Sequence, residues 1–506
     1  MRKLLALSLL FSVVLNNIQA QSFYWGYPFL GEDETGKTVS HVVDEDIYRI
    51  ASHYDLDIFN YRIAADAFSG DELERTSTVD LGIAQPSMGS AMATHHSMFQ
   101  KNGVNFAFFS RETDRNNSQN NFYVQDVNIA NGEKSQRVKL THIQGKNNSN
   151  IGQFLTAQSE NGAYYAILKE PAFYRKTLEK IEIVLLDAEM NTLATLEHEF
   201  ETDADRGPQH SLHVDNNGNV FVVKRFDLKK QKPYHAIYAW KRNAQSLEVH
   251  SLKQDDNYQI AQIYPHFRGE KFYLAALLTS DGSTTFSLKV DMSGRHSGTL
   301  GSALVMLEFS PKGELVYTVR NEFERPISNL SIKDILSNNG NLWVIMQRMQ
   351  IDERSSGQEM ASGNTPKNYT YLSNGFAVSL VSAETGKVKW TKQIETDEPN
   401  TKNDNGSFLS VLPFLQGDNL VLLYNETRDL RSGAVRNPLL KRFPIMEHVS
   451  PAGETVEKKA FTNAGVGVEE DEIFDLDTSH IVKVSDGKYL IRARGRGEYK
   501  YGYLQM

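Results

Sequence analysis

One pattern constrains the fold of this 506-residue chain more than any other: a short polar turn containing glycine, followed at once by an apolar or aromatic stretch, recurs seven times. The glycine often follows Asn or Asp, and such pairs supply the positive φ that tight hairpins require. The flanking β-branched and aromatic residues suit strands. The sequence therefore predicts a repeated hairpin, with turn glycines at Gly103, Gly162, Gly218, Gly269, Gly340, Gly417 and Gly487.

A second kind of hairpin follows most of these turns, in which a strand ends in a polar turn and re-enters a more charged strand. Its turns lie around Gly132, Asn191, Gly313, Gly386 and Gly453. Two hairpins per unit make four antiparallel strands, which is the blade of a β-propeller. The turn glycines are 59, 56, 51, 71, 77 and 70 residues apart, so we expect an all-β propeller of about seven four-stranded blades, several with insertions.

The two ends of the chain each hold half of a unit. The hairpin at Gly487 has no second hairpin after it, and a hairpin around Gly70 has no first hairpin before it. We therefore predict that residues 22–82 supply the outer strands of a blade whose inner strands are residues 478–500, so that the ring has no exposed edge. The expected blades are 93–145, 151–204, 208–254, 258–322, 329–398, 406–463, and 478–506 completed by 22–82.

Two alternatives to this assignment stay open at the level of sequence. Residues 42–58 carry apolar side chains at a spacing that also fits a short helix capped by Asp44. A two-domain β-sandwich would likewise give short strands joined by polar turns.

One unit contains a more specific motif. Residues Ala383 to Trp390 read Ala-Glu-Thr-Gly-Lys-Val-Lys-Trp, and this octapeptide resembles the repeat of quinoprotein-type propellers and their cofactor-free envelope relatives. The resemblance implies that Trp390 stacks on the tight turn of a neighbouring blade. It covers eight residues in one blade, so it implies the fold and not a bound quinone.

The N-terminal segment is typical of a signal peptide. Arg2 and Lys3 precede an apolar run over residues 4–15, and cleavage is expected after Ala20. That run is too short to span a bilayer, which takes about 20 residues. We expect an exported protein, periplasmic or extracellular, in which residues 21–506 form a single propeller without a membrane span.

Composition excludes several classes of site and partner. The chain has no cysteine, which rules out disulfides, thiolate metal sites and cysteine nucleophiles. Its formal net charge is −9, and removal of residues 1–20 takes away two basic residues and makes it −11. A net acidic chain is a poor binder of polyanions, so nucleic acid is not an expected partner.

Candidate ligand-binding residues come from aligning the blades on the turn glycine. Polar side chains fall seven or eight positions before that glycine, near the start of the strand that lines the channel of a propeller. Polar groups that converge at one end of an apolar scaffold are typical of a ligand site. The candidates are His95, His96, His210, Gln262, Lys333 and His480.

Acidic residues precede some of these strands. Asp203 and Asp205 lie before His210, and Asp475 and Asp477 lie before His480. Imidazole and carboxylate together hold divalent cations, and a histidine beside a carboxylate also acts as a general base. These four aspartates are the predicted metal ligands, with a divalent cation as the only expected cofactor.

The sequence favours a binding module over an enzyme. We expect a monomer that binds a protein, or a small-molecule or glycan ligand, through the channel mouth and inserted loops. A hydrolase or lyase is the first alternative, with His96, His210 or His480 as base or metal ligand and Lys333 as electrostatic stabiliser. A structural envelope scaffold is the second, working through insertions at residues 280–302 and 351–370.

Overall fold

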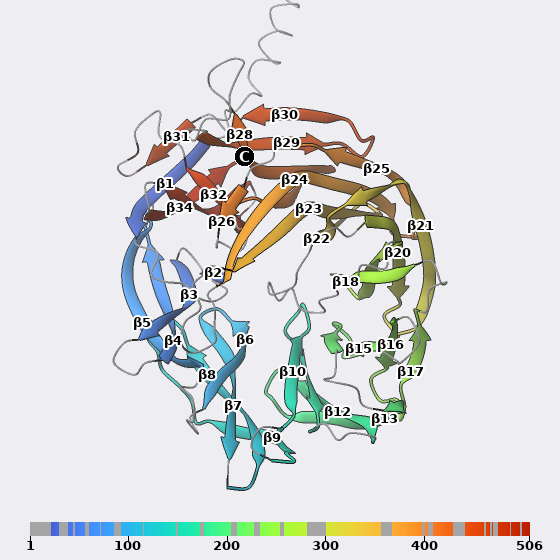
Figure 1. Cartoon of the computed structure of the whole chain (residues 1–506). Helices are drawn as coiled ribbons and strands as arrows, with labels where there is room; N and C mark the ends of the chain where they lie inside the picture. Colours follow the sequence, from blue (N-terminus) through green and yellow to red (C-terminus); the bar gives the residue numbers. More distant parts are fainter. Residues whose placement is uncertain are drawn as a thin grey trace, which may run out of the picture.

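The computed structural model describes residues 22–29, 39–43, 46–55, 60–70, 72–85, 93–114, 116–147, 150–172, 177–203, 210–226, 233–252, 258–280, 300–355, 367–396, 400–402, 408–428, 441–459, 462–465, 468, 474–485, 487–495 and 498–506. Throughout these residues the regular structure consists of strands, and no helix is assigned. The strands form eight separate sheets arranged as a ring around a central axis (Figure 1).

Seven of the eight sheets are blades built from consecutive strands. The first four blades are, from the inner strand outward, β2 (Val39–Val43), β3 (Asp46–Asp55), β4 (Asn60–Ser69), β5 (Glu74–Gln85); β6 (Thr94–Asn102), β7 (Asn105–Asp114), β8 (Gln119–Asn128), β9 (Val138–Gln144); β10 (Gln153–Gln158), β11 (Tyr164–Glu170), β12 (Leu178–Asp187), β13 (Thr192–Asp203); and β14 (His210–Val214), β15 (Val220–Phe226), β16 (Tyr234–Trp240), β17 (Glu248–Ser251).

The next three blades follow the same order. They are β18 (Gln259–Arg268), β19 (Lys271–Thr279), β20 (Leu300–Phe309), β21 (Leu315–Ser328); β22 (Leu330–Asn338), β23 (Asn341–Ser355), β24 (Lys367–Ser382), β25 (Val388–Ile394), with β26 (Asn400–Lys402) paired to β24; and β27 (Val411–Gln416), β28 (Asn419–Arg428), β29 (Lys441–Val449), β30 (Thr455–Lys459).

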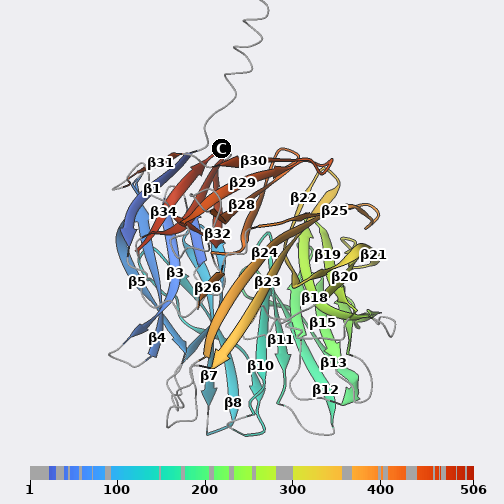
Figure 2. The same ribbon diagram turned by 45° about the horizontal axis from the view of Figure 1, so that its top comes forward.

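Blade 8 joins the two ends of the chain. Its inner strands are β32 (Asp475–Ser485), β33 (Lys488–Gly495) and β34 (Glu498–Gln505), followed outward by β1 (Ser22–Phe29) and β31 (Thr462–Gly465). Because β1 pairs antiparallel with β34, the N-terminal and C-terminal strands share one blade, as expected. Figure 2 shows β1, β31 and β34 side by side at one edge of the ring.

The predicted blade count of about seven is wrong, because the ring has eight blades. Residues 39–85 form a complete blade of their own, and from the predicted outer strands 22–82 only β1 contributes to closure. Only Asp44 and Glu45 separate β2 from β3, and this connection contains no glycine. The hairpin therefore lacks the signal that marks the other seven.

The helix considered for residues 42–58 and the two-domain β-sandwich are both wrong. Residues 46–55 form β3, in which Ile47, Tyr48, Ile50 and Ala51 are all buried. Since β3 is covered on both faces, its apolar residues do not alternate, and the pattern resembles a helix. The eight four- or five-stranded sheets each pack against two neighbours in the ring, not face to face as a pair (Figure 1).

The hydrophobic core lies between blades. The cluster between blades 3 and 4, for example, combines Leu168, Ile183 and Phe200 with Val222 and Tyr238. Each blade thus buries both of its faces against neighbours, so the closed ring has a continuous core.

The turn predictions are confirmed. All seven turn glycines have φ between 47° and 80°. Trp390 docks on the next blade as the resemblance implied: its Nε1 donates to the carbonyl of Pro451 at 3.0 Å, and a Cβ on Gly453 would lie 3.5 Å from its ring.

Candidate functional site

The two faces of the ring differ in what they carry. On one face, tight turns join the first strand of each blade to the second and the third strand to the fourth. We call this the turn face. The opposite face, where second strands end, third strands begin and one blade leads to the next, we call the connection face. The sequence-predicted candidates lie near the starts of inner strands, so they belong to the connection face.

A buried ionic cluster lies at the connection end of the seam between blades 3 and 4. His210 at the start of β14 lies between two carboxylates: its Nδ1 pairs with Glu170 Oε1, and its Nε2 is 3.1 Å from Glu179 Oε1. Lys224 Nζ is 2.6 Å from Glu179 Oε2 and 3.4 Å from His210 Nε2. Gln153 donates to the second oxygen of Glu170. Five polar side chains from two blades therefore meet in one network.

The cluster is almost sealed from solvent. The His210 side chain is 0% exposed, and the side chains of Glu170, Lys224 and Glu179 are 1%, 4% and 11% exposed. The ring of Phe200 stacks on His210 at 5.7 Å between centroids, and Lys224 Nζ lies 4.5 Å from the centre of the same ring. Aromatic faces attract cations, so Phe200 stabilises the ammonium where water cannot reach it.

Burial and pairing act on the acids and bases of this cluster in opposite directions. Burial acts to raise the pKa of Glu179, but its hydrogen bond with His210 and the charge of Lys224 outweigh burial and hold that pKa below its ordinary value. Burial lowers the pKa of Lys224, which the charge of Glu179 partly offsets. The lysine and glutamate thus stabilise each other's charged forms.

Gln262 contacts protein backbone. Its Nε2 donates to the carbonyl of Ile332 at 2.9 Å, and its Oε1 accepts the Ile332 amide at 2.6 Å. Asn425 makes the same two-way contact with Leu476 of the next blade, at 2.7 and 2.9 Å. Gln262 thus joins the inner strands of blades 5 and 6, and Asn425 joins the second strand of blade 7 to the inner strand of blade 8. The backbone contact explains a polar residue at position 262 without a ligand.

Lys333 is the extra residue of a β-bulge between Ile332 and Asp334. The neighbouring Asp334 accepts from the Tyr264 hydroxyl at 3.2 Å and from the Ile335 amide at 2.8 Å. Burial raises the pKa of Asp334, although these two hydrogen bonds act to lower it. Tyr264 and Asp334 belong to the inner strands of blades 5 and 6, so their hydrogen bond joins these two blades.

His95 and His96 follow each other at the start of β6 and contact different rings. His95 lies against Phe108 at 4.9 Å, and burial lowers its pKa to about 4. His96 lies edge-on to Phe122 at 5.0 Å. The two side chains therefore pack into opposite seams of blade 2, as alternate strand positions require.

Of the predicted metal ligands, Asp475 and Asp477 have described side chains, and both lie on β32. Asp477 is buried and accepts from Arg492 Nε at 2.8 Å, so it already has a cationic partner. Asp475 begins β32. Asp205 lies outside the described residues, and so do the side chains of Asp203 and His480. Within the described part of the chain, no three His, Asp or Glu residues are arranged to hold a metal ion.

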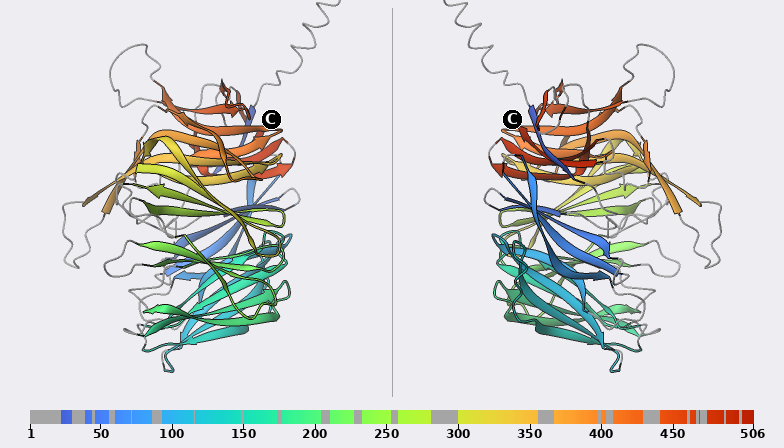
Figure 3. Two further views of the ribbon diagram at one scale, coloured as in Figure 1. Left: turned by 90° about the vertical axis from the view of Figure 1, so that its right-hand side faces the viewer. Right: turned by 90° about the vertical axis from the view of Figure 1, so that its left-hand side faces the viewer.

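A long hairpin arm projects from the connection face (Figure 3). β22 pairs with β23 only as far as Arg348, whereas β23 and β24 continue together from Gln350↔Leu372 to Ser355↔Lys367. These six pairs extend the hairpin by about 20 Å at the usual rise per residue. β26 pairs with β24 at Thr370–Leu372 and gives this arm, defined as residues 350–355 and 367–372, a third strand.

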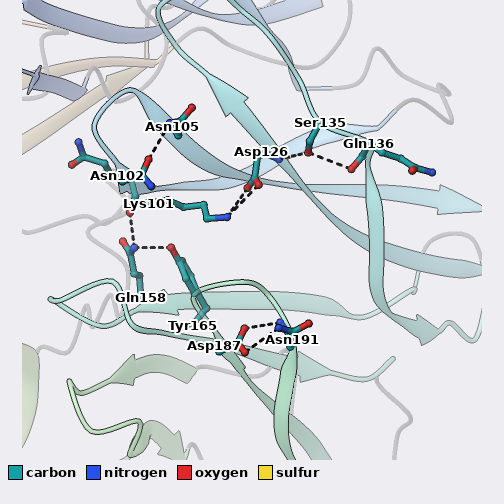
Figure 4. Close-up of polar contacts among 11 residues, drawn as sticks. Lys101, Asn102, Asn105, Asp126, Ser135, Gln136, Gln158, Tyr165, Asp187 and Asn191 are labelled. Atoms are coloured by element: carbon teal, nitrogen blue, oxygen red, sulfur yellow. Dashed lines mark hydrogen bonds and ion pairs between the residues drawn. The ribbon is translucent and has the colours of Figure 1, made fainter.

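The turn face has a polar hollow on blade 2 of about 510 Å³, lined by Asn105, Asp126, Val127, Asn128, Glu133, Lys134 and Ser135. Figure 4 shows that its polar groups contact one another. Lys101 Nζ lies 3.1 Å from Asp126, Ser135 Oγ accepts the Asp126 amide at 2.9 Å, and Asn105 donates to Asn102 at 3.0 Å. These contacts are those of a stabilised turn region.

Sequence reasoning found His210 and missed its partners. Lys224 was detectable, because it follows the turn glycine Gly218 by six residues and so pairs with His210 in register. Glu170 and Glu179 come from the neighbouring blade, 40 and 31 residues before His210. No local pattern links them to it.

The fold places the chain in the class of eight-bladed β-propellers, on the evidence of its sheet topology. No family model matches the sequence, and no curated protein matches it. The WD40 domain of SCAP from fission yeast is similar in structure, at 10% identity and a TM-score of 0.40 over 96% of this chain and 98% of that chain.

Two further solved structures are similar at the same level. A europium-containing methanol dehydrogenase has 11% identity and a TM-score of 0.39, over 93% of this chain and 84% of that chain. The β-propeller domain of the Trilobed protease from Pyrococcus furiosus has 10% identity and a TM-score of 0.34, over 89% and 97%. No helix in the described residues is long and apolar enough to cross a membrane.

Proposed function

We propose that this chain is an exported β-propeller that binds a partner protein through its connection face, with the arm as the main contact. The observation that carries this proposal is the six-pair extension of β23 and β24 beyond the blade. The base of the arm joins the core, where Tyr371 is buried with Met349 and Leu409, but the hairpin continues for four further pairs, from Asp352↔Thr370 to Ser355↔Lys367. Extra strand length outside the ring adds surface for contact.

The placement of the candidate side chains supports binding over catalysis. A general base must come within about 3 Å of a substrate proton. The His210 side chain is 0% exposed and Gln262 is bonded to backbone. Export, through cleavage near Ala20, is part of this proposal, and it rests on the N-terminal sequence pattern.

Trimming the arm tests the proposal. Because Asp352 and Thr370 are cross-strand partners, residues 353–369 are replaced with Asn-Gly, which closes the hairpin at that pair and keeps the buried Tyr371. A matched control shortens the connection between β28 and β29 by replacing residues 429–440 with Asn-Gly, between the partners Arg428 and Lys441.

The readout is capture of partners from an envelope extract by the mature protein, followed by measurement of affinity for the captured partner. We expect the control to retain the partner and the arm variant to lose it, while both keep the melting temperature of the parent. Equal capture by the arm variant would exclude the arm as the binding surface.

A further inference from the structure

Closure of the ring depends on one short strand that lies between two others. β1 pairs antiparallel with β34, from Ser22↔Gln505 to Phe29↔Tyr499, and parallel with β31, from Ser22↔Thr462 to Trp25↔Gly465. Both edges of β1 are therefore hydrogen-bonded near its start. We call the space that it fills, bounded by β34, β31 and the turn at Gly70–Leu73, the β1 slot.

Two aromatic side chains anchor β1. Phe23 and Trp25 are both 0% exposed and pack with residues of blades 7 and 8, among them Leu423, Phe474 and Ile491. The Trp25 ring lies 5.1 Å from Phe474. Deeply buried aromatic anchors dominate the affinity of protein interfaces, and β1 carries two within four residues.

The slot is shaped to fit Trp25. A Cβ added to Gly502 would lie 2.5 Å from Trp25 Cε3, and one added to Gly465 would lie 1.9 Å from the Trp25 carbonyl oxygen. Any larger residue at either position would collide with the strand. On the side of blade 1, the Tyr27 amide donates to the carbonyl of Glu72 at 2.9 Å. Three parts of the chain are thus fitted to one strand.

We propose that the β1 slot is a strand-acceptor surface whose partner is β1 of a second copy of this chain. The contacts described above join β1 to strands and turns far from it in the sequence, and nine residues, 30–38, separate it from β2. An exchanged β1 would make the same contacts in trans, and exchange of an identical element is a low-cost route to dimers. Strand addition to a sheet edge supplies the backbone bonds, and Phe23 and Trp25 supply specificity.

Concentration sets which copy fills the slot. A strand tethered by a short linker has an effective concentration of about millimolar. In dilute solution each chain therefore closes its own ring and is a monomer. Exchange occurs when chains fold together at high concentration, and the exchanged dimer persists because reopening requires β1 to leave a fully buried site.

Two chains with complementary defects test the proposal. In one, Trp25→Ala removes the anchor and leaves the slot intact. In the other, Gly502→Val obstructs the slot and leaves β1 intact. Differently labelled, they are refolded together at high concentration and separately. We expect a heterodimer only in the mixture, with a melting temperature above that of either chain alone.

A peptide provides a second measurement should the variants fold poorly. A labelled peptide of residues 21–30 is added to the Trp25→Ala chain during refolding, and the same peptide with Trp25→Ala serves as its control. We expect saturable binding of the first and at least about 100-fold weaker binding of the second, because a buried tryptophan is lost. Absence of the heterodimer overturns the proposal, even where the peptide binds, since the slot would then accept a strand but not that of a second copy.

Discussion

The turn face and the connection face are built from the same strands and use their polar residues differently. On the turn face, side chains bond to the backbone of the next turn: Asn216 donates to Gly269 at 3.0 Å, and the Tyr317 hydroxyl donates to Ala383 at 3.1 Å. On the connection face, charged groups meet in the cluster around His210, and the arm extends outward. The turn face, where blades contact the next turn, maintains the architecture. The connection face carries the features specific to this protein, namely the ionic cluster and the arm.

The largest expected effect comes from breaking the ionic cluster. Lys224→Met leaves two buried carboxylates with too few cationic partners, and removal of one partner from a buried charge network costs about 3–5 kcal/mol of unfolding free energy. Lys169→Met removes the less buried partner of Glu182, on the opposite face of blade 3, and should cost about 1 kcal/mol.

Urea unfolding of both variants measures the difference. Equal losses of unfolding free energy in the two variants would mean that the cluster contributes no more to stability than an ordinary ion pair. The ionic cluster would then not distinguish the connection face from the turn face in stability.

A smaller effect concerns His213, three residues after His210 on β14. His213 lies on the opposite face of the strand, where it contacts Phe272 and where Ser211 Oγ is 3.1 Å from its Nε2. Burial lowers its pKa from 6.5 to about 4. The unfolded chain therefore binds a proton that the folded chain does not, and stability falls as the pH drops from 6.5 towards 4.

This difference in proton binding lowers the free energy of unfolding by about 2 kcal/mol at about pH 5. Melting temperatures between about pH 7 and about pH 5 should fall less for His213→Gln than for the parent. His142→Gln, at an exposed position on β9, is the control and should keep the parental dependence. An unchanged slope in His213→Gln would assign the acid sensitivity to other groups.

The smallest expected effect tests docking on the turn face. Gly386 and Gly340 have φ of 67° and 76°, so alanine is strained at both by about 1 kcal/mol. A Cβ at Gly386 would lie 2.4 Å from Tyr317 Cε2, whereas nothing lies within 4 Å at Gly340. Gly386→Ala should therefore destabilise by about 1–2 kcal/mol more than Gly340→Ala.

Thermal and urea unfolding of this pair isolate the contact between blades from backbone strain. If the two variants lose the same stability, Tyr317 moves aside without cost and the docking is not specific.

Particular residues show how far the sequence could predict this fold. Seven glycines marked seven hairpins because each needs positive φ, a local requirement. The sequence between β2 and β3 contains no glycine, so blade 1 was merged into the closing blade. Trp390 was placed correctly because its neighbouring turn is set by the repeat itself.

The site was less predictable. The register alignment selected His210 and Gln262 by their distance from a turn, but that distance says nothing about the neighbouring blade. His210 has carboxylates across its seam, while Gln262 has the backbone of Ile332. His210 and Gln262 hold similar positions relative to their turn glycines but have different roles. Their partners, which decide those roles, lie 31 to 70 residues away in the sequence.

The sequence by itself determined that this chain is a ring of four-stranded units, because turn conformation and strand propensity are local properties repeated along it. Only the tertiary structure decided that there are eight blades, that β1 and β31 complete the last one, and that His210 lies between Glu170 and Glu179. The physical reason is that seams between blades bring together side chains distant in sequence, and their pairing depends on how the whole ring packs.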